Sequence, residues 1–333
     1  MMSAESDKKI QRWSNLKEVG TYGGLFFLMW VYKIFGRGIY SVMLYFAIGY
    51  FYLFNPVARN ASKDYLATHF SAYPHCWGDS VGKLDVLRHM FAFGQSILDK
   101  FLAWTSTISE EEFDIVDEPR LREFLEESKG QLIIGSHLGN LEYCRGFVHR
   151  YKRKTINVLV YDQHSANFVN IMQRANPDSR MHIYQVDSLD IATILSLKEK
   201  VEKGEWLFIA GDRIPLSGEQ RVVPVDFMGR TASLPIGPYI LAKVLQCPVK
   251  LMFSYRVGKR IRFEMIPFAD KVLLSRKNQG AELCAYAQQF ATELERQCEH
   301  APFQWFNFYP YWVDSKPLIA SSPKGFESVT NDK

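Results

Sequence analysis

The sequence predicts an α/β fold in which a mixed sheet is flanked by helices, preceded by an N-terminal helical region that associates with a membrane. From about residue 111 onward, short apolar runs of strand character alternate with helical stretches, as in layered α/β proteins. Before that point, apolar runs rich in aromatic residues occupy 22–30 and 38–54. With 47% hydrophobic residues, the 333-residue chain can bury a large core, which excludes disorder.

The two N-terminal runs are interrupted by Lys33 and Arg37, and the second run holds 17 uncharged residues. That length is the lower limit of the roughly 17 to 25 residues that cross hydrocarbon. A single span, a hairpin, a monotopic anchor and a buried core helix all stay open, although the clustered aromatics favour the membrane interface. The preceding residues carry many charges and no cleavage site comes after the runs, so we expect the anchor to be retained.

The chain divides into three predicted parts. Residues 1–110 form the helical membrane-anchoring region, whose stretch 60–110 has apolar residues at helical spacing and packs the anchor onto the α/β domain. Residues 111–313 form that α/β domain. Residues 314–333 form a polar C-terminal tail with too few apolar residues to fold by itself.

Within the α/β domain, six apolar runs have strand character. They are 131–136, 156–161, 181–186, 205–211, 248–257 and 260–268. The sequence VGK at 257–259 predicts the turn of a hairpin between the last two. Helices are predicted after a cap at Asp187 or Ser188, ending at Gly204, and over about 281–298.

Charge and cysteine content limit the classes of partner, compartment and metal site that the sequence predicts. A net charge of +4 is too mild to indicate nucleic acid but suits an anionic membrane surface. The five cysteines contain no CxxC pair, so we expect reduced thiols on the cytosolic side of a membrane. His75, Cys76 and His164 do not complete a metal-binding pattern, and there is no HExxH motif, so no metal is expected.

The most informative stretch is GSHLGNLEYCR at 135–145, where an apolar strand ends at a histidine and a carboxylate comes five positions later. On one helix these side chains would diverge by about 140°, so they can meet only across a strand–loop–helix junction, with Gly139 in the turn. Glu142 would then hold one ring nitrogen of His137, so that the other takes a proton from a hydroxyl. Backbone N–H groups at the helix start would stabilise an oxyanion. The alternative is a surface histidine and a capping glutamate.

No protein nucleophile accompanies this histidine. GSHLG is not a GxSxG elbow, because Ser136 comes one position too early, and the sequence holds no other GxSxG.

Four ordered blocks carry a resemblance to a known family. They are GSHLGNLE (135–142), GEWLFIAGDR (204–213), VPVDFMGRTASLPIGPYILAKVLQCPV (223–249) and PFQWFNFYPYW (302–312). Together they resemble the late acyltransferases of bacterial lipid A biosynthesis, and even more the related acyltransferases of glycolipid and aryl polyene gene clusters. The resemblance covers most of the chain and implies a glycerolipid acyltransferase-like domain.

The resemblance implies that an acyl chain moves from a thioester of acyl carrier protein or coenzyme A to a hydroxyl or amine of a lipid or glycolipid. His137 and Glu142 match the catalytic dyad of an HxxxxD/E motif. Since the thioester is already activated, no cofactor or covalent enzyme intermediate is expected. The lipid acceptor implies the bacterial inner membrane, with the catalytic domain on its cytoplasmic side.

Six residues of the matching blocks are expected to bind substrate: Asn140, Asp212, Arg213, Gly229, Pro235 and Gly237. Arg213 would hold a phosphate or carboxylate, or else form an ordinary loop pair with Asp212. Turn formation is the alternative for the glycines and the proline. Glycerol-phosphate acyltransferases have a Pro-Glu-Gly-Thr block where this chain has GDRIPLSGEQ, which disfavours such acceptors. A lysophospholipid or amino-lipid acyltransferase, or a catalytically silent membrane scaffold, remain the alternative functions.

Overall fold

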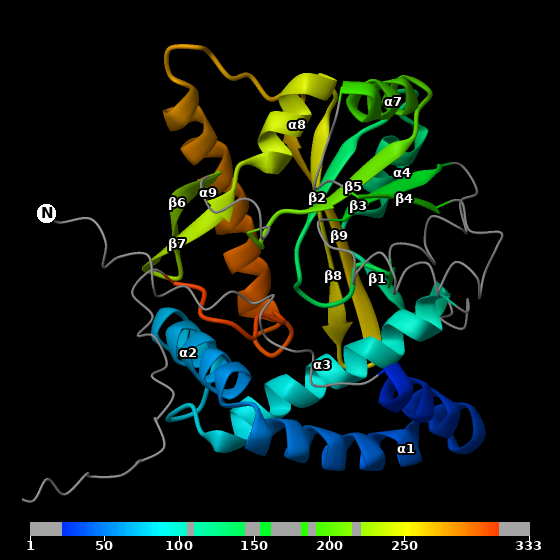
Figure 1. Cartoon of the computed structure of the whole chain (residues 1–333), viewed down its shortest axis with the longest axis vertical. Coiled ribbons are helices and arrows are strands. Elements are labelled where there is room, and N and C mark those ends of the chain that lie inside the picture. The colour runs from blue at the N-terminus through cyan, green and yellow to red at the C-terminus, as the bar shows by residue number, and fades with distance from the viewer. Residues whose placement is uncertain are drawn as a thin grey trace, which may run out of the picture.

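The computed structural model describes residues 22–104, 110–143, 154–160, 181–185, 191–214 and 221–312 (Figure 1). The predicted tail 314–333, the predicted cap at 187 or 188 and His164 lie outside these residues.

A seven-stranded mixed sheet forms the centre of the described structure, with strand order β1-β9-β8-β2-β5-β3-β4. The strands are β1 (Phe113–Ile115), β2 (Leu132–Gly135), β3 (Ile156–Val160), β4 (Met181–Gln185), β5 (Trp206–Ala210), β8 (Val249–Val257) and β9 (Arg260–Ala269). All neighbouring pairs are parallel except β8 and β9, which form an antiparallel hairpin turning at Gly258. The predicted mixed α/β sheet is confirmed, and so are its six predicted strands.

Helices cover both faces of this sheet. Alternate residues of β2 point to opposite sides: Ile134 packs in the cluster that includes α9, whereas Ile133 packs against α4. The first face is covered by α7 (Ile191–Glu202), α8 (Gly237–Leu245) and α9 (Gln279–His300), and the second by α4 (Glu118–Glu126). Because both faces are buried, the central strands are continuous apolar runs rather than alternating ones, which is why they are recognisable in the sequence.

A second, two-stranded sheet was not predicted as strands. β6 (Val222–Phe227) and β7 (Arg230–Pro235) pair antiparallel, and β6 packs against α9. Their turn places Met228 and Gly229 at φ 57° and 73°, the left-handed geometry that suits tight hairpins. Pro224 and Asp226 within the strand, and a methionine in the turn, concealed this hairpin from the sequence pattern. The three-residue β1 and the nine-residue α4 were too short to predict.

The N-terminal region is a stack of helices: α1 (Tyr22–Phe54), α2 (Pro56–Ala72), the 3-10 turn η3 (Pro74–Cys76) and α3 (Lys83–Trp104). The two predicted apolar runs belong to one helix that kinks at Gly36, where φ is 75°. Its segment Trp30–Phe54 is long and apolar enough to cross a membrane. Figure 1 shows α1 lying beside α3 along one end of the molecule.

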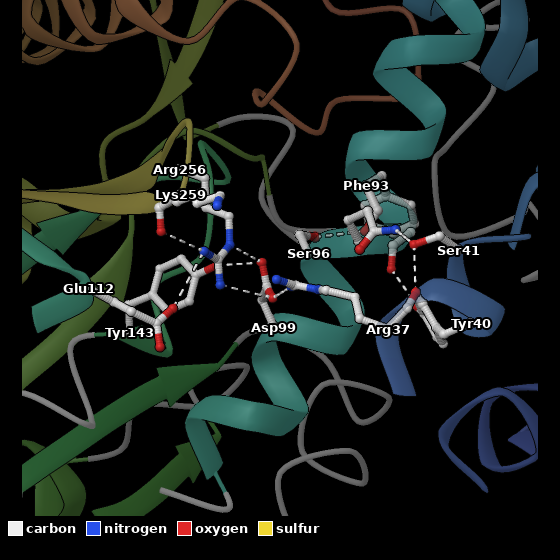
Figure 2. A network of polar contacts seen from close by, with 12 residues as sticks. Arg37, Tyr40, Ser41, Phe93, Ser96, Asp99, Glu112, Tyr143, Arg256 and Lys259 are labelled. Carbon is white, nitrogen blue, oxygen red and sulfur yellow. Dashed lines mark hydrogen bonds and ion pairs between the residues drawn. The ribbon is translucent and has the colours of Figure 1, made fainter. Parts of the chain in front are cut away.

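A buried carboxylate, Asp99 on α3, ties this helical stack to the sheet (Figure 2). Only 2% exposed, it accepts hydrogen bonds from the guanidinium groups of Arg37 on α1 and Arg256 on β8, the latter from Nε at 2.6 Å. The hydroxyl of Tyr143 donates a further bond at 2.6 Å. One side chain therefore joins α1, α3, β8 and the turn after β2.

Replacing Asp99 with Asn should destabilise the protein, because it leaves two guanidinium groups without their shared, buried negative charge. We expect the free energy of unfolding to fall by about 3 kcal/mol, the usual effect of removing one partner of a buried ion pair. Urea unfolding in detergent measures it. The control is Glu199→Gln, which breaks an exposed pair with Lys203 and should leave the free energy of unfolding close to that of the wild type. Equal losses in the two variants would contradict a structural role for Asp99.

Candidate active site

The pairing of β2 with β5 places His137 beside Asp212. Gly135 and Ala210 are register partners at the carboxyl ends of these parallel strands, and each functional residue comes two positions later. The imidazole Nδ1 lies 2.7 Å from Asp212 Oδ1, and the backbone N–H of His137 donates to Oδ2 at 2.8 Å. The candidate site therefore forms at the carboxyl edge of the sheet, where open α/β sheets bind their ligands.

Asp212 is 1% exposed and receives a third donor, the indole Nε1 of Trp305, at 3.1 Å. Its backbone carbonyl accepts the hydroxyl of Tyr311 at 3.2 Å. Its carboxylate is thus used by protein donors and holds His137 in place, while the expected contact of Asp212 with substrate stays a prediction. A carboxylate at Nδ1 selects the tautomer with a proton there, which leaves Nε2 as a base. The histidine side chain is 31% exposed, which leaves it open to a substrate.

The electrostatics of the pair favour a neutral imidazole. Burial, together with the positive charge of Arg213, lowers the pKa of His137 below its usual value, against the opposing effect of Asp212. Burial alone would raise the pKa of Asp212, but His137 and its hydrogen bonds, with Arg213, hold it below its ordinary value. At neutral pH the arrangement is a neutral base beside an ionised carboxylate.

Glu142 lies on the turn after β2, near His137 in sequence, but the carboxylate bonded to the ring nitrogen is that of Asp212. The charge of Glu142 acts instead on Lys100 of α3: burial lowers the pKa of this lysine, Glu142 raises it and Arg213 lowers it. The positive charges of Arg213 and Lys100 both lower the pKa of His137, and the expected contact between Glu142 and the imidazole stays a prediction. A catalytic role for Glu142 remains a prediction.

The turn from His137 to Tyr143 is held by its own hydrogen bonds. Asn140 is buried, its Oδ1 accepts the N–H of Glu142 at 3.0 Å, and its carbonyl accepts that of Tyr143 at 3.2 Å. The backbone N–H groups of 138, 139 and 140 donate to Ser136 Oγ, Gln304 O and Ser254 O. These three groups are therefore used within the protein, and stabilisation of an oxyanion by backbone N–H groups at the helix start stays a prediction. Asn140 forms the turn, and its binding of substrate stays a prediction.

Arg213 does not form the loop pair with Asp212 that was one of its two interpretations. Its Nη2 donates to the carbonyl of Phe306 at 2.6 Å, and its guanidinium lies 5.9 Å from the ring centre of Tyr309. Within the described residues its Nε is buried and has no hydrogen-bond acceptor. A buried donor without an acceptor is compatible with the other interpretation, in which Arg213 meets an anionic or polarised group of a substrate, and that contact stays a prediction.

The three remaining predicted substrate-binding residues lie on the hairpin and just after it. Gly229 is in the turn and donates its N–H to Asp226 Oδ1 at 3.0 Å, Pro235 ends β7, and Gly237 begins α8. Each has a backbone role there. Lining of an acyl or acceptor groove by these residues stays a prediction.

Sequence reasoning did not identify Lys100, Trp305 or Tyr311 as site residues, and it used the aromatic block 302–312 for its resemblance to a family. Trp305 does pack, since it is fully buried, but it also donates to Asp212. These contacts join positions 93 to 99 apart, and no local pattern signals them.

Among the described residues, one group of His, Cys and acidic side chains is close enough to share a metal ion. It comprises His75, Cys76 and Glu299, whose ligand atoms lie within 4.8 Å of one another. It shares no residue with the site around His137. The reaction's independence of metal stays a prediction.

Gly139 supplies a sharp test of the turn. Its φ is 65°, and a Cβ there would lie 2.1 Å from the carbonyl oxygen of Ser254, so Gly139→Ala should displace the turn from β8 and lower activity at least roughly tenfold. Gly258→Ala is the matched control, since φ is 62° but no atom lies within 4 Å, and its effect should be limited to about 1 kcal/mol of stability. Activity assays and thermal unfolding compare the variants, and equal activity would show that the close approach at Gly139 is unimportant.

A family model described as bacterial lipid A biosynthesis acyltransferase matches residues 83–313. The match runs from the start of α3 past Trp312 and includes His137, Glu142, Asp212 and Arg213. A comparison with curated proteins finds no match. Since the matched range is well over half of the chain and the family consists of acyltransferases, the chain is an acyltransferase and belongs to the bacterial lipid A biosynthesis acyltransferase family.

Proposed function

We propose that this acyltransferase moves an acyl chain from acyl carrier protein or coenzyme A thioester to a hydroxyl or amine of a lipid or glycolipid. The observation that carries the proposal is the bond between His137 Nδ1 and the buried Asp212, which leaves Nε2 as the base on a partly exposed ring. The lipid acyltransferase family supports the general reaction.

The proposed reaction needs only a base and stabilisation of charge. Nε2 of His137 removes the proton of the acceptor hydroxyl as the oxygen attacks the thioester carbonyl. The tetrahedral intermediate then expels the thiolate, which takes the proton back from the imidazolium as the ester forms. Asp212 stabilises the imidazolium during this cycle without accepting its proton.

Positive charge beside the base fits the negative charge that develops on the carbonyl oxygen. Arg213 has a buried N–H directed to no acceptor among the described residues, and Lys100 lies close enough to affect the pKa of His137. We assign Arg213 to the oxyanion or to an anionic part of the donor. Glu142 completes the catalytic group by balancing the charge of Lys100.

The acceptor is drawn from the inner leaflet of the bacterial inner membrane, with the catalytic domain in the cytoplasm, where acyl carrier protein and coenzyme A are found. The apolar α1 supports membrane association. A glycolipid acceptor is favoured by the resemblance of the sequence blocks, while a lysophospholipid or an amino-lipid are alternative acceptors for the same chemistry.

Removing the base tests the function itself. Purified protein is incubated with acyl carrier protein and coenzyme A thioesters and bacterial lipid extract, and acylated lipids are identified by mass spectrometry. His137→Ala should lower product formation by about 10²- to 10⁴-fold, the usual contribution of a general base. Circular dichroism confirms that the variant is folded. Unchanged product formation would favour a different base, and no product from wild type with any acceptor would favour the silent scaffold.

Two carboxylate variants then separate Asp212 from Glu142. Asp212→Asn should lower kcat by about 10²- to 10⁴-fold with little change in KM, because an amide at Nδ1 no longer stabilises the imidazolium. Glu142→Gln should lower activity because the charge of Lys100 is then no longer balanced. The double variant that also carries Lys100→Met should therefore be only slightly less active than Glu142→Gln alone. Additive losses would place Glu142 in contact with the reaction independently of Lys100.

The pH dependence provides a separate test, since Arg213 lowers the pKa of His137. A group with a lowered pKa loses its proton at lower pH, so kcat/KM rises with pH through that pKa. Arg213→Met removes the cation, which raises the pKa of His137 and moves the acidic limb of the kcat/KM profile to higher pH. Arg213→Lys keeps the charge and should leave the limb near wild type while lowering the rate, because the forked geometry is lost. Identical limbs in the Met and Lys variants would remove Arg213 from the electrostatics of the base.

A further inference from the structure

The contacts between α1 and α3 show that these two helices run in opposite directions. Near the start of this contact, the guanidinium of Arg37 on α1 bonds to Asp99 on α3. Further along α1, Tyr40 Oη donates to Gly94 O at 2.9 Å, and Gln95 Nε2 donates to Ser41 Oγ at 3.0 Å. Later still, the rings of Tyr45 and Phe91 stack with their centres 4.1 Å apart, so residue numbers decrease overall on α3 as they increase on α1. The two helices therefore lie antiparallel and side by side from Arg37 to Tyr45 of α1.

α3 itself belongs to the folded body. Its buried His89 bonds to Ser62 Oγ on α2 at 2.8 Å and, through Nε2, to the carbonyl of Trp305 at 2.9 Å. If α1 crossed a bilayer, α3 would lie at the same depth, and the sheet domain attached to it would enter the hydrocarbon. Such burial of a polar, charged domain in lipid is not possible.

The two sides of α1 differ sharply in exposure. One side, with Val31, Tyr40, Leu44 and Ile48, is at most 8% exposed and packs inward. The opposite side holds large apolar residues that are 47% to 73% exposed: Phe27, Trp30, Ile34, Phe35, Ile39, Val42, Phe46, Tyr50, Leu53 and Phe54. An exposed apolar surface of this size marks an interaction site.

Charge identifies the partner. From Tyr22 to Phe54 there is no acidic residue, and both charged residues, Lys33 and Arg37, are cationic. Arg59, just beyond the end of the helix, donates to the carbonyl of Tyr52 at 2.7 Å and adds a third cation. Although Arg37 is paired with Asp99, an apolar, aromatic face that lies beside Lys33 and Arg59 and holds no acidic residue matches the interface of a bilayer that contains anionic lipid.

We propose that α1 lies in the plane of the membrane as a monotopic helix, with its exposed side among the acyl chains of one leaflet and α3 above it, rather than crossing the bilayer. This orientation does not depend on the proposed reaction. It does place the site close to the membrane, because Asp99 bonds both to Arg37 of α1 and to Tyr143, next to Glu142.

Depth measurements distinguish the orientations. Single cysteines are introduced in place of Phe35, Ile39, Phe46 and Leu53, after the natural cysteines are replaced by serine or alanine. Each is labelled with bimane in the full chain, bound to vesicles of phosphatidylethanolamine and phosphatidylglycerol. Lipids carrying nitroxides at known depths then quench the label. An in-plane helix predicts one shallow depth for all four positions, and Leu195→Cys, on the exposed side of α7, serves as the unquenched control.

A crossing helix would instead give depths that increase from Phe35 to the middle and decrease again toward Leu53, and that profile would overturn the proposal. Absence of quenching at all four positions would also overturn it, and would indicate that a second copy or another protein covers the face. As a check without labels, Phe46→Glu should weaken vesicle binding by about tenfold or more, because burying one aromatic side chain contributes about 1.5–3 kcal/mol. Leu195→Glu should leave binding unchanged.

Discussion

The carboxylate of Asp212 is the group on which the site depends, because three separate segments of the chain meet at it. The backbone and ring of His137 come from the end of β2, the indole of Trp305 from the C-terminal aromatic segment, and the aspartate itself from the end of β5. An ionised group that is 1% exposed is tolerated only with such a set of donors. The same bonds that offset its burial also fix the tautomer and orientation of the imidazole, so stability and catalytic geometry share one cause.

A second buried carboxylate, Asp99, holds the other end of the same turn. The stretch from His137 to Tyr143 begins on Asp212 and ends on Asp99, through the hydroxyl of Tyr143. Between these two points Gly139 passes close to β8, its N–H bonded to Gln304 O and its neighbour Asn140 bonded to Ser254 O. A turn anchored at both ends loses little further entropy on binding a substrate, which is the physical meaning of a preorganised site.

Much of the fold was predictable because strands buried on both faces appear as continuous apolar runs, as at 132–135 and 206–210. The histidine was predictable because it comes directly after such a run. Its partner was not, since Glu142 is five positions away and Asp212 is 75, and only the register of β2 against β5 brings the latter to Nδ1. The hairpin β6–β7 was missed for a different reason: a proline and an aspartate within the strand and a methionine at positive φ depart from strand and turn preferences, and packing against α9 overrides them.

The position of α1 bears on how such a site avoids water as an acceptor. A base that deprotonates a lipid hydroxyl also deprotonates water, and a thioester reacts with either. Selective transfer to the lipid therefore requires that the lipid hydroxyl be held next to His137, so that it reacts with the thioester before water does. Under the proposed orientation, Arg37 and Tyr143 share Asp99, so the catalytic turn is connected by a single carboxylate to the helix that lies in the lipid. An acceptor held in the leaflet then diffuses in two dimensions at nearly the height of the site. Under the proposed function and orientation, the apolar face of α1 and the buried ion pair behind it serve the same end as the histidine, since they bring the hydroxyl to the base instead of carrying the base into the membrane.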